Sequence, residues 1–413
     1  MKISLFTLGT TGDVEPVIAL ARRLQKEGHQ IQACSVDLHA ERFRGLGLDF
    51  RCVGESGIQD SNMDETFDRL LRRADPLHQF GVIADLLLHK AGDRYARCVK
   101  EMETTQLAIC HIIDVVAIAA AMDCRVPWIS MRFDTLGIAT SSHSPFLIDF
   151  GTWINRFLWK SGEWLLGLKV DRILRERLPR SVERHPSLKM FRTYSPHLNL
   201  IAVSPELSSI PADLPSSFRV TGPWALDDPE FVPSPMLESF LNAHSKPAVV
   251  GFGSVAGSGL PPLITTSVAA LRKRGLPVIV QNSRTTQETL ESPDVLSAGY
   301  VPHAFLLKRA RLLIHHGGAG TAAAVGREGV PSIVIPHNSD QFYWGQRLYE
   351  LGVAPSPLKR SKVTTERLEA LIRNLEDNPG YQARASELSR RLRREDGLGI
   401  AATAIQQFAA ALH

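Results

Sequence analysis

The stretch RLLIHHGGAGTAAAVGREGVPSIVIPHNSDQFYWG, residues 311–345, decides the fold of this chain. An apolar run at 312–314 ends at two histidines, and glycines, a run of small helix-forming residues and a second apolar run at 332–335 follow. This order predicts a strand, a glycine turn, a helix and another strand. The turn places bare backbone N–H groups at a helix N-terminus, where the helix dipole attracts anions. We therefore expect this turn to bind a diphosphate.

The spacing of these glycines differs from that of other phosphate-binding loops. No lysine follows them as in G-x-x-x-x-G-K-[ST], and they fit G-x-G-x-x-G only loosely because Ala323 takes the last place. Asp340 and Gln341 lie beyond the following strand, where a carboxylate and a carboxamide can hydrogen-bond neighbouring sugar hydroxyls. A diphosphate site beside such groups indicates a nucleotide sugar as ligand.

Length and composition describe a soluble globular protein of two domains. A chain of 413 residues exceeds the size at which one hydrophobic core usually suffices. The net charge of +4 is too small to indicate a nucleic-acid partner. The cysteines lack the paired spacing of a metal site and are typical of reduced thiols in a cytosolic protein. They are Cys34, Cys52, Cys98, Cys110 and Cys124.

Neither the first residues nor the longest apolar tract predicts a membrane segment. MKISLFTLG is a short apolar run that predicts a first strand and not a signal peptide. The apolar tract 107–121 is interrupted by His111 and Asp114 and is too short to span a bilayer. We expect a cytoplasmic protein, with a peripheral contact to the membrane left open.

Strand-like and helical runs alternate along the chain, which predicts α/β domains with parallel sheets. The first unit consists of a strand at 3–8, a turn at 9–13 and a helix at 16–27. A second series begins near Ala248 with VVGFGS, and a segment rich in proline and acidic residues, ALDDPEFVPSP, precedes it. That segment is expected to link the two domains.

Taken together, these blocks resemble the inverting glycosyltransferases of family GT1, which have the GT-B fold. In pattern they are similar to sterol glucosyltransferases and to the glycosyltransferases of glycopeptide-antibiotic pathways. The likeness rests on TLGTTGDVEP at 7–16, TGPW at 221–224, VVGFGS at 249–254 and the HHGGAGT block at 315–321. It implies an α/β protein of two Rossmann-like parallel-sheet domains that face each other across a cleft.

The resemblance also implies the domain boundaries. We expect an N-terminal acceptor-binding domain at 1–222, a linker at 223–247, and a C-terminal nucleotide-sugar-binding domain at 248–390. The last residues, 391–413, are expected to form a helix that crosses back to the N-terminal domain. The oligomeric state, a monomer or a weak dimer, is left open.

Asp13 is the expected catalytic base, because it lies in the first strand-to-helix turn, where many relatives carry histidine and the glycopeptide branch carries aspartate. An ordinary aspartate has a pKa of about 3.9 and is a poor base for an alcohol, so burial or a second carboxylate has to raise that pKa. Asp114 matches the position of an aspartate that orients the base in relatives. Asp114 either shares a proton with Asp13 or caps the following helix, and Asp13 itself also fits a helix N-cap ahead of Pro16.

The resemblance assigns the donor site residue by residue. Ser254 and His316 are expected to contact the phosphates together with the turn residues Gly318, Gly320 and Thr321. Ser254 also fits an ordinary turn, and a histidine after a strand is often structural. Asp340 and Gln341 are expected at the 3- and 4-hydroxyls of the sugar, or as a helix cap. Tyr300 either stacks on the base or packs, and the Val301 backbone is expected to contact the edge of the base.

Two departures from the plant members leave the nucleotide open between UDP and dTDP. Ala324 stands where those members carry a glutamate for the ribose, and Ile335 stands where they carry a tryptophan. No D-x-D motif is present, so we expect no metal site and no permanently bound cofactor. The leaving diphosphate is expected to be neutralised by the helix dipole, His316 and Ser254.

Aromatic and basic residues alternate over the segment 145–180. The segment either packs as an amphipathic helical pair or lines the acceptor pocket, where its basic edge would face a membrane surface. Overall we expect transfer of a hexose, in the first place glucose from UDP-glucose, to a hydroxyl of a sterol, polyketide or aromatic acceptor. The alternatives are a nucleotide-sugar epimerase of the same architecture and a non-catalytic relative that binds nucleotide sugar.

Overall fold

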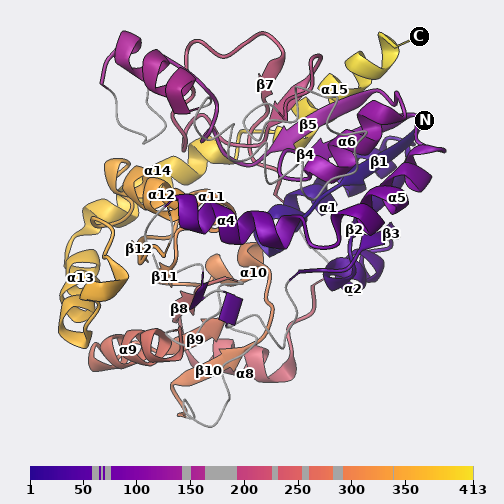
Figure 1. The fold of residues 1–413 in the computed structure, drawn as a ribbon. Coiled ribbons are helices and arrows are strands. Elements are labelled where there is room, and N and C mark those ends of the chain that lie inside the picture. Colours follow the sequence, from indigo (N-terminus) through magenta and orange to yellow (C-terminus); the bar gives the residue numbers. More distant parts are fainter. Residues whose placement is uncertain are drawn as a thin grey trace. The chain divides into compact units, whose positions relative to one another are not determined.

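The computed structural model describes residues 1–57, 65–66, 68–69, 76–141, 150–162, 193–225, 231–253, 260–281, 292–337 and 339–412. The chain divides into two compact units. Unit 1 contains Met1–Asp60, Phe80–Leu226 and Asp396–His413, and unit 2 contains Ser61–Gln79 and Asp227–Glu395. Each unit is built on its own parallel sheet (Figure 1).

Unit 1 has a seven-stranded sheet in the order β3-β2-β1-β4-β5-β6-β7, and every pair of neighbouring strands is parallel. The strand order reverses direction at β1, so the carboxyl ends of β1 and β4 border the position where open α/β sheets bind ligands. The strands are β1 Lys2–Phe6, β2 Gln30–Val36, β3 Asp49–Gly54, β4 Leu107–His111, β5 Trp128–Arg132, β6 Asn199–Ile201 and β7 Phe218–Val220.

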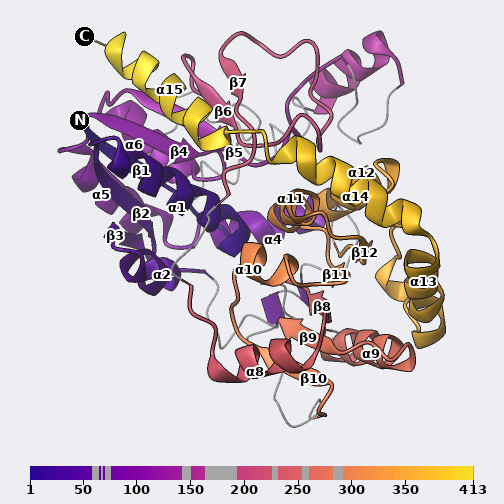
Figure 2. The same cartoon turned by 180° about the vertical axis from the view of Figure 1, so that it is seen from behind.

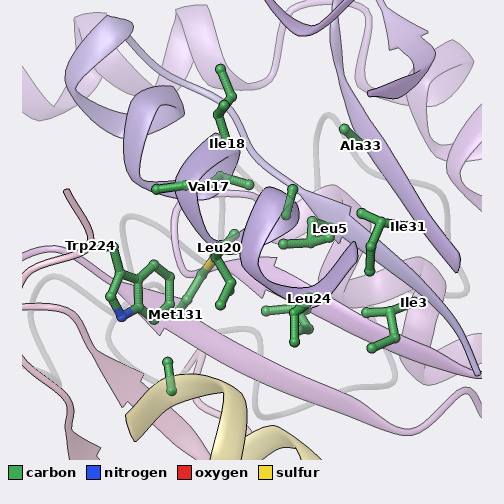
Figure 3. Packing of buried hydrophobic residues seen from close by; sticks show 14 of the residues in the cluster. Ile3, Leu5, Val17, Ile18, Leu20, Leu24, Ile31, Ala33, Met131 and Trp224 are labelled. Carbon is green, nitrogen blue, oxygen red and sulfur yellow. The ribbon is translucent and has the colours of Figure 1, made fainter. Parts of the chain in front are cut away.

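Alternation along β1 sends side chains to both faces of this sheet, because successive residues of a strand point in opposite directions. Ile3 and Leu5 pack in one buried cluster with Val17, Leu20 and Leu24 of helix α1 (Figure 3), and Phe6 packs in another with α5 and α6. The helices are α1 Thr11–Lys26, α2 Ala40–Gly45, α4 Pro76–Leu87, α5 Ala91–Met102, α6 Val115–Asp123 and α15 Gly397–Ala410, and a 3₁₀ turn, η1, covers Asp37–His39.

The last helix, α15, belongs to unit 1, although unit 2 intervenes in the sequence. Ala401, Ala402 and Ile405 of α15 are buried in the same cluster as α1, and Figure 2 shows the yellow α15 beside the indigo strands and helices of that unit. Trp224 joins this cluster and donates from its indole Nε1 to Thr221 Oγ1 at 3.0 Å. The domain boundaries expected from the sequence stay a prediction.

Unit 2 has a five-stranded, fully parallel sheet in the order β10-β9-β8-β11-β12. The strands are β8 Ala248–Gly251, β9 Val278–Gln281, β10 Val295–Ala298, β11 Leu313–His315 and β12 Ser332–Val334. The helices are α8 Pro235–Ala243, α9 Leu260–Lys273, α10 His303–Leu307, α11 Ala319–Glu328, α12 Ser339–Glu350, α13 Thr365–Asp377 and α14 Pro379–Leu392, and η5 covers Arg360–Lys362. The two parallel α/β sheets predicted from the sequence are confirmed.

One face of the unit 2 sheet is covered by α9 and α13, whose apolar residues share a buried cluster with Val250 and Ile314. On α11, Gly326 lies close to α14, and an added Cβ there would meet Leu392 at 2.6 Å. Strand β11 lies between β8 and β12 in this sheet, and the turn that follows it leads into α11. None of the helices in the described part of the chain is long and apolar enough to cross a membrane.

Candidate active site

The first turn of unit 1 positions Asp13 at the N-terminus of α1. Oδ2 of Asp13 accepts hydrogen bonds from the backbone N–H of Thr10 at 2.8 Å and from its hydroxyl at 3.1 Å. Gly9 has a φ of +107°, and a Cβ at this position would lie 2.3 Å from Asp13 Oδ2. The glycine therefore allows the carboxylate to fold back over the turn. Both bonds end on Oδ2, which leaves Oδ1 for another partner.

Burial raises the pKa of Asp13 above its ordinary value and outweighs the two hydrogen bonds from Thr10 and the charge of His39, which lower that pKa. His39 is buried beside the same turn, and its Nε2 lies 3.1 Å from the Gly9 carbonyl. A carbonyl only accepts, so Nε2 carries the hydrogen. The turn thus holds a carboxylate that binds a proton more readily than an exposed aspartate does.

Asp114 has two structural contacts in unit 1. Its Oδ1 accepts from the Ala117 backbone N–H at 2.9 Å, so it caps α6, and it forms an ion pair with the guanidinium of Arg94. Both side chains are buried, with exposed fractions of 0% and 2%. The capping alternative is therefore present in the structure, together with an ion pair that the sequence did not indicate. Neither contact involves Asp13, and a proton shared between the two aspartates stays a prediction.

The turn after β11 in unit 2 depends on two glycines. Gly317 has a φ of +89°, and a Cβ there would lie 2.8 Å from the Gln341 carbonyl oxygen. A Cβ on Gly318 would lie 2.5 Å from His316 Nε2. Gly318 is the N-cap residue of α11, and it provides no side-chain hydrogen bond to the helix. The first N–H groups of α11 therefore lack a side-chain cap, and Gly320 and the buried Thr321 lie in this first turn.

His316 lies beside this helix end in a defined neutral form. Burial, together with the nearby His337 and His303, lowers the pKa of His316 to about 3. The Gly251 backbone accepts a hydrogen bond from its ring, and the buried Nδ1 has no hydrogen-bond partner among the residues that the structure describes. Nδ1 of the neutral ring is then a lone-pair acceptor. To donate a hydrogen bond to a phosphate oxygen, this nitrogen has to take up a proton.

Three further histidines surround His316. His315 is fully buried, and its Nδ1 accepts from the Gly317 backbone N–H at 3.1 Å. Burial lowers the pKa of both His303 and His337 to about 4, with Arg360 adding to the effect on His337. The sequence interpretation missed His303 and His337 as site residues. Both follow a strand of the sheet closely, at the edge where parallel strands place their functional residues, and that position was the available signal.

The residues expected at the sugar lie at the start of α12. Gln341 is buried, and its Oε1 accepts from the His337 backbone N–H at 2.8 Å. This bond occupies the carbonyl oxygen and leaves the amide N–H groups of Gln341 for a ligand. Asp340 lies beside it in the first turn of α12.

Tyr300 and Val301 follow β10. Tyr300 is 52% exposed, whereas Val301 is buried and its carbonyl accepts from Gln281 Nε2 at 2.5 Å. Both border a cavity of about 300 Å³ within unit 2. Ser254 lies outside the described residues. In the described part of the chain, no group of three or more histidine, cysteine or acidic side chains is placed to hold a metal ion.

Two family models match the chain. Residues 3–130 match the glycosyltransferase family 28 N-terminal domain. Residues 268–395 match the C-terminal domain of erythromycin biosynthesis protein CIII-like proteins. Each match falls on one of the two parallel sheets.

Several curated proteins are similar to the chain over nearly its whole length. O-mycaminosyltylonolide 6-deoxyallosyltransferase of Streptomyces fradiae is 26% identical, with 99% of this chain and 98% of that protein covered. Glycosyltransferase GtfC of Amycolatopsis orientalis is 27% identical over 97% and 96%. Sterol 3-beta-glucosyltransferase of Debaryomyces hansenii is 24% identical over 98% of this chain, which spans only 26% of that longer protein.

Solved structures share the fold. The glycosyltransferase of kitacinnamycin has a TM-score of 0.71 and 20% identity, with 98% of each chain covered. Glycosyltransferase VinC in complex with dTDP has a TM-score of 0.68 and 19% identity over the full length of both chains. The spinosyn rhamnosyltransferase SpnG complexed with thymidine diphosphate has a TM-score of 0.66 and 16% identity, covering 98% of this chain and all of that one.

Proposed function

Because this chain belongs to the glycosyltransferases of the GT-B fold, we propose that it transfers a hexose from a nucleoside diphosphate to a hydroxyl group of a lipophilic small molecule. Glucose from UDP-glucose is the first candidate donor, and the reaction inverts the anomeric carbon. The observation that carries the proposal is the N-terminus of α11 beside His316. Among the residues that the structure describes, no side chain caps this helix end and none hydrogen-bonds His316 Nδ1.

The donor diphosphate is proposed to bind at that helix end. The first N–H groups of α11 and the positive end of its dipole would receive the phosphate oxygens, with the Thr321 hydroxyl as a further donor. His316 would add a charge-assisted hydrogen bond from Nδ1 after protonation. Asp340 and the free amide N–H groups of Gln341 would hold hydroxyls of the sugar, and Tyr300 would contact the base.

Asp13 is proposed as the base. The acceptor oxygen forms a bond to the anomeric carbon while the bond from that carbon to the diphosphate oxygen breaks, and the acceptor proton moves to Asp13. Burial of the carboxylate raises its pKa, which favours this proton transfer. The leaving diphosphate keeps the bonding electrons, and the protonated His316 with the α11 N-terminus would stabilise its charge. This scheme needs no divalent metal, so EDTA should leave the activity unchanged.

A lipophilic acceptor is supported by the helix at 152–162 of unit 1. Three of its apolar side chains are exposed, Trp153 by 86%, Ile154 by 52% and Phe157 by 68%, whereas Trp159 is buried. A cavity of about 280 Å³ lies beside it, lined by Ala139, Thr140, Arg156, Trp159, Lys160 and Asp213. Residues 145–149 and 163–180 of the segment lie outside the described residues. Relatives named for tylonolide and sterol derivatives suggest the same class of acceptor.

Two named neighbours are complexes with thymidine diphosphate, so a dTDP-sugar is the second candidate donor. A thermal-shift series with UDP, dTDP, UDP-glucose and dTDP-glucose separates the two, because a ligand that binds only the native state raises the melting temperature. A higher melting temperature with the UDP ligands alone, or with the dTDP ligands alone, identifies the donor nucleotide. An unchanged melting temperature with all four ligands would contradict the proposed donor site.

Transfer itself is tested by incubating the preferred donor with sterol and polyketide acceptors and detecting the glycoside by mass spectrometry. A β-linked product from an α-linked donor supports inversion. Release of an isomerised sugar without an acceptor would favour an epimerase. Nucleotide binding with no product from any acceptor would favour a non-catalytic relative.

A further inference from the structure

His337, between β12 and α12, is held by two hydrogen bonds that define its chemistry. Its ring Nδ1 lies 2.8 Å from the Ile335 carbonyl, and its backbone N–H donates to Gln341 Oε1 at 2.8 Å. A carbonyl oxygen only accepts, so Nδ1 carries the ring hydrogen. The tautomer is therefore fixed by the backbone of the preceding strand.

The other ring nitrogen, Nε2, is a lone-pair acceptor. Burial lowers the pKa of His337 to about 4, so the ring is neutral at physiological pH. Nε2 is buried and accepts no hydrogen bond from any residue that the structure describes. A buried acceptor without a donor costs roughly 1–3 kcal/mol, and such groups in native proteins call for an explanation.

The chemistry of Nε2 limits what can bind to it. The Ile335 carbonyl holds the ring hydrogen on Nδ1, so Nε2 of the neutral ring needs an O–H or N–H donor. A sugar hydroxyl supplies one directly, whereas a diphosphate oxygen would bind only if the ring took up a second proton, as proposed for His316. The ring is close enough to His316 for the two to influence each other's charge, and it lies 5.7 Å from the ring of Phe252, centroid to centroid. His337 therefore lies near both His316 of the proposed phosphate site and Gln341 of the proposed sugar site, which favours a sugar hydroxyl as the donor to Nε2.

We propose that His337 Nε2 accepts a hydrogen bond from a hydroxyl group of the transferred sugar, an inference that rests on the proposed function of the donor site. The backbone bond to Gln341 ties His337 to the residue proposed to hold the sugar. The residues proposed for the base, Tyr300 and Val301, follow a different strand. His337 is thus a residue that selects for the sugar and not for the nucleotide.

The test compares nucleotide and nucleotide sugar in one variant series. His337→Phe keeps an aromatic ring beside Phe252 but removes the acceptor, and His337→Gln returns an amide oxygen near the position of Nε2. Calorimetry with UDP, UDP-glucose, dTDP and dTDP-glucose gives the affinities. His337→Phe should bind the sugar conjugate about tenfold more weakly, as expected for one lost hydrogen bond, while the affinity for the free nucleotide is unchanged.

A second measurement identifies the hydroxyl. UDP-glucose analogues that lack one sugar hydroxyl each are titrated against the native protein and His337→Phe, the variant without the acceptor. One analogue should bind the native protein about tenfold more weakly, and that loss should shrink in a variant that has already lost the contact. His244→Phe is the matched control, because this half-buried histidine near the end of α8 has its Nε2 near the Pro293 carbonyl and should affect neither ligand.

Three results would overturn the inference. In the first, His337→Phe binds the nucleotide and the nucleotide sugar more weakly by the same factor. In the second, it binds the sugar conjugate as tightly as the native protein does. In the third, removing any sugar hydroxyl weakens binding by the same factor in the variant as in the native protein. A native protein that binds neither nucleotide would instead contradict the proposed function itself, so the two failures are distinguishable.

Discussion

The turn after β1 and the turn after β11 have the same local construction but place different groups at the helix end that follows. In each, a buried strand leads through a glycine with positive φ into the N-terminus of a helix, with Gly9 ahead of α1 and Gly317 ahead of α11. In each, a missing Cβ makes room for a functional side chain, since Gly9 admits Asp13 and Gly318 admits His316. The two turns differ in which groups accept hydrogen bonds from the first backbone N–H groups of the helix.

The α1 N-terminus is closed by its own residues, because Thr10 and Asp13 form a capping box. A carboxylate already lies at the positive end of that helix dipole, which makes the end unfavourable for a second anion. No side chain in the described ranges caps the α11 N-terminus, and its neighbours are histidines that burial keeps neutral. The comparison suits the proposed roles, in which the capped turn holds the base and the turn without a side-chain cap receives the diphosphate.

The largest effect is expected from Asp13→Asn. Asparagine still accepts from Thr10 but cannot take a proton, so kcat should fall by about a thousandfold, within the range for a general base. The native enzyme should lose activity as pH falls through the pKa of Asp13, which burial raises above the usual aspartate value, and the variant should lack this dependence.

Two controls accompany Asp13→Asn. Nucleotide affinity should stay unchanged, because Asp13 is not part of the donor site. A raised pKa means that ionised Asp13 is less favourable in the folded than in the unfolded state, so at neutral pH the variant should melt no earlier than the native protein. Full turnover by the variant would show that Asp13 is not the base.

Asp114→Asn is expected to lower the free energy of unfolding and to leave the catalytic step itself unchanged. The amide still caps α6, but the buried Arg94 loses its counter-charge, and breaking a buried pair in this way costs about 3–5 kcal/mol. The exposed N-cap residue of α15 provides the matched control, because Asp396→Asn should cost about 1 kcal/mol or less. Thermal unfolding measures both. A shifted pH dependence of kcat with unchanged stability would instead favour a proton shared with Asp13.

Gly318→Ala tests the open helix end. The added Cβ would lie 2.5 Å from His316 Nε2 and displace that ring, so nucleotide affinity should fall by about tenfold or more. Gly92→Ala makes the same change in the first turn of α5, where the Cβ meets nothing within 4 Å, and should leave binding unchanged and stability equal or higher. Titration calorimetry compares the two, and equal affinities would contradict the role of this turn.

The smallest effect is proton uptake by His316. Its pKa of about 3 in the free protein must rise when Nδ1 donates to a phosphate, so the complex holds more protons and affinity should increase as pH falls. UDP-glucose titrated in buffers of different ionisation enthalpy should show uptake of a fraction of one proton near pH 6. His316→Ala should show none, and equal uptake by both proteins would exclude this histidine.

Much of this comparison was predictable from the sequence, because both turns are local. Strand, glycine and helix follow one another within about fifteen residues in each case. The expected N-cap role of Asp13 ahead of Pro16 was wrong, because Thr10 is the N-cap residue of α1. Asp13 instead closes the capping box from the third helical position. The partner of Asp114 was not visible, because Arg94 comes from another helix and its burial depends on how α5 packs on the sheet. The neutral state of the histidines likewise follows from burial, which only the folded unit defines.

The return of α15 to unit 1 has a consequence for how the protein is made. A ribosome completes the seven strands of unit 1 and then the whole of unit 2 before the residues that cover part of the α1 core are synthesised. At roughly 5–20 residues per second, unit 1 waits on the order of ten seconds or more with apolar surface exposed. A nascent chain of this kind depends on its last helix to close the domain that it began first.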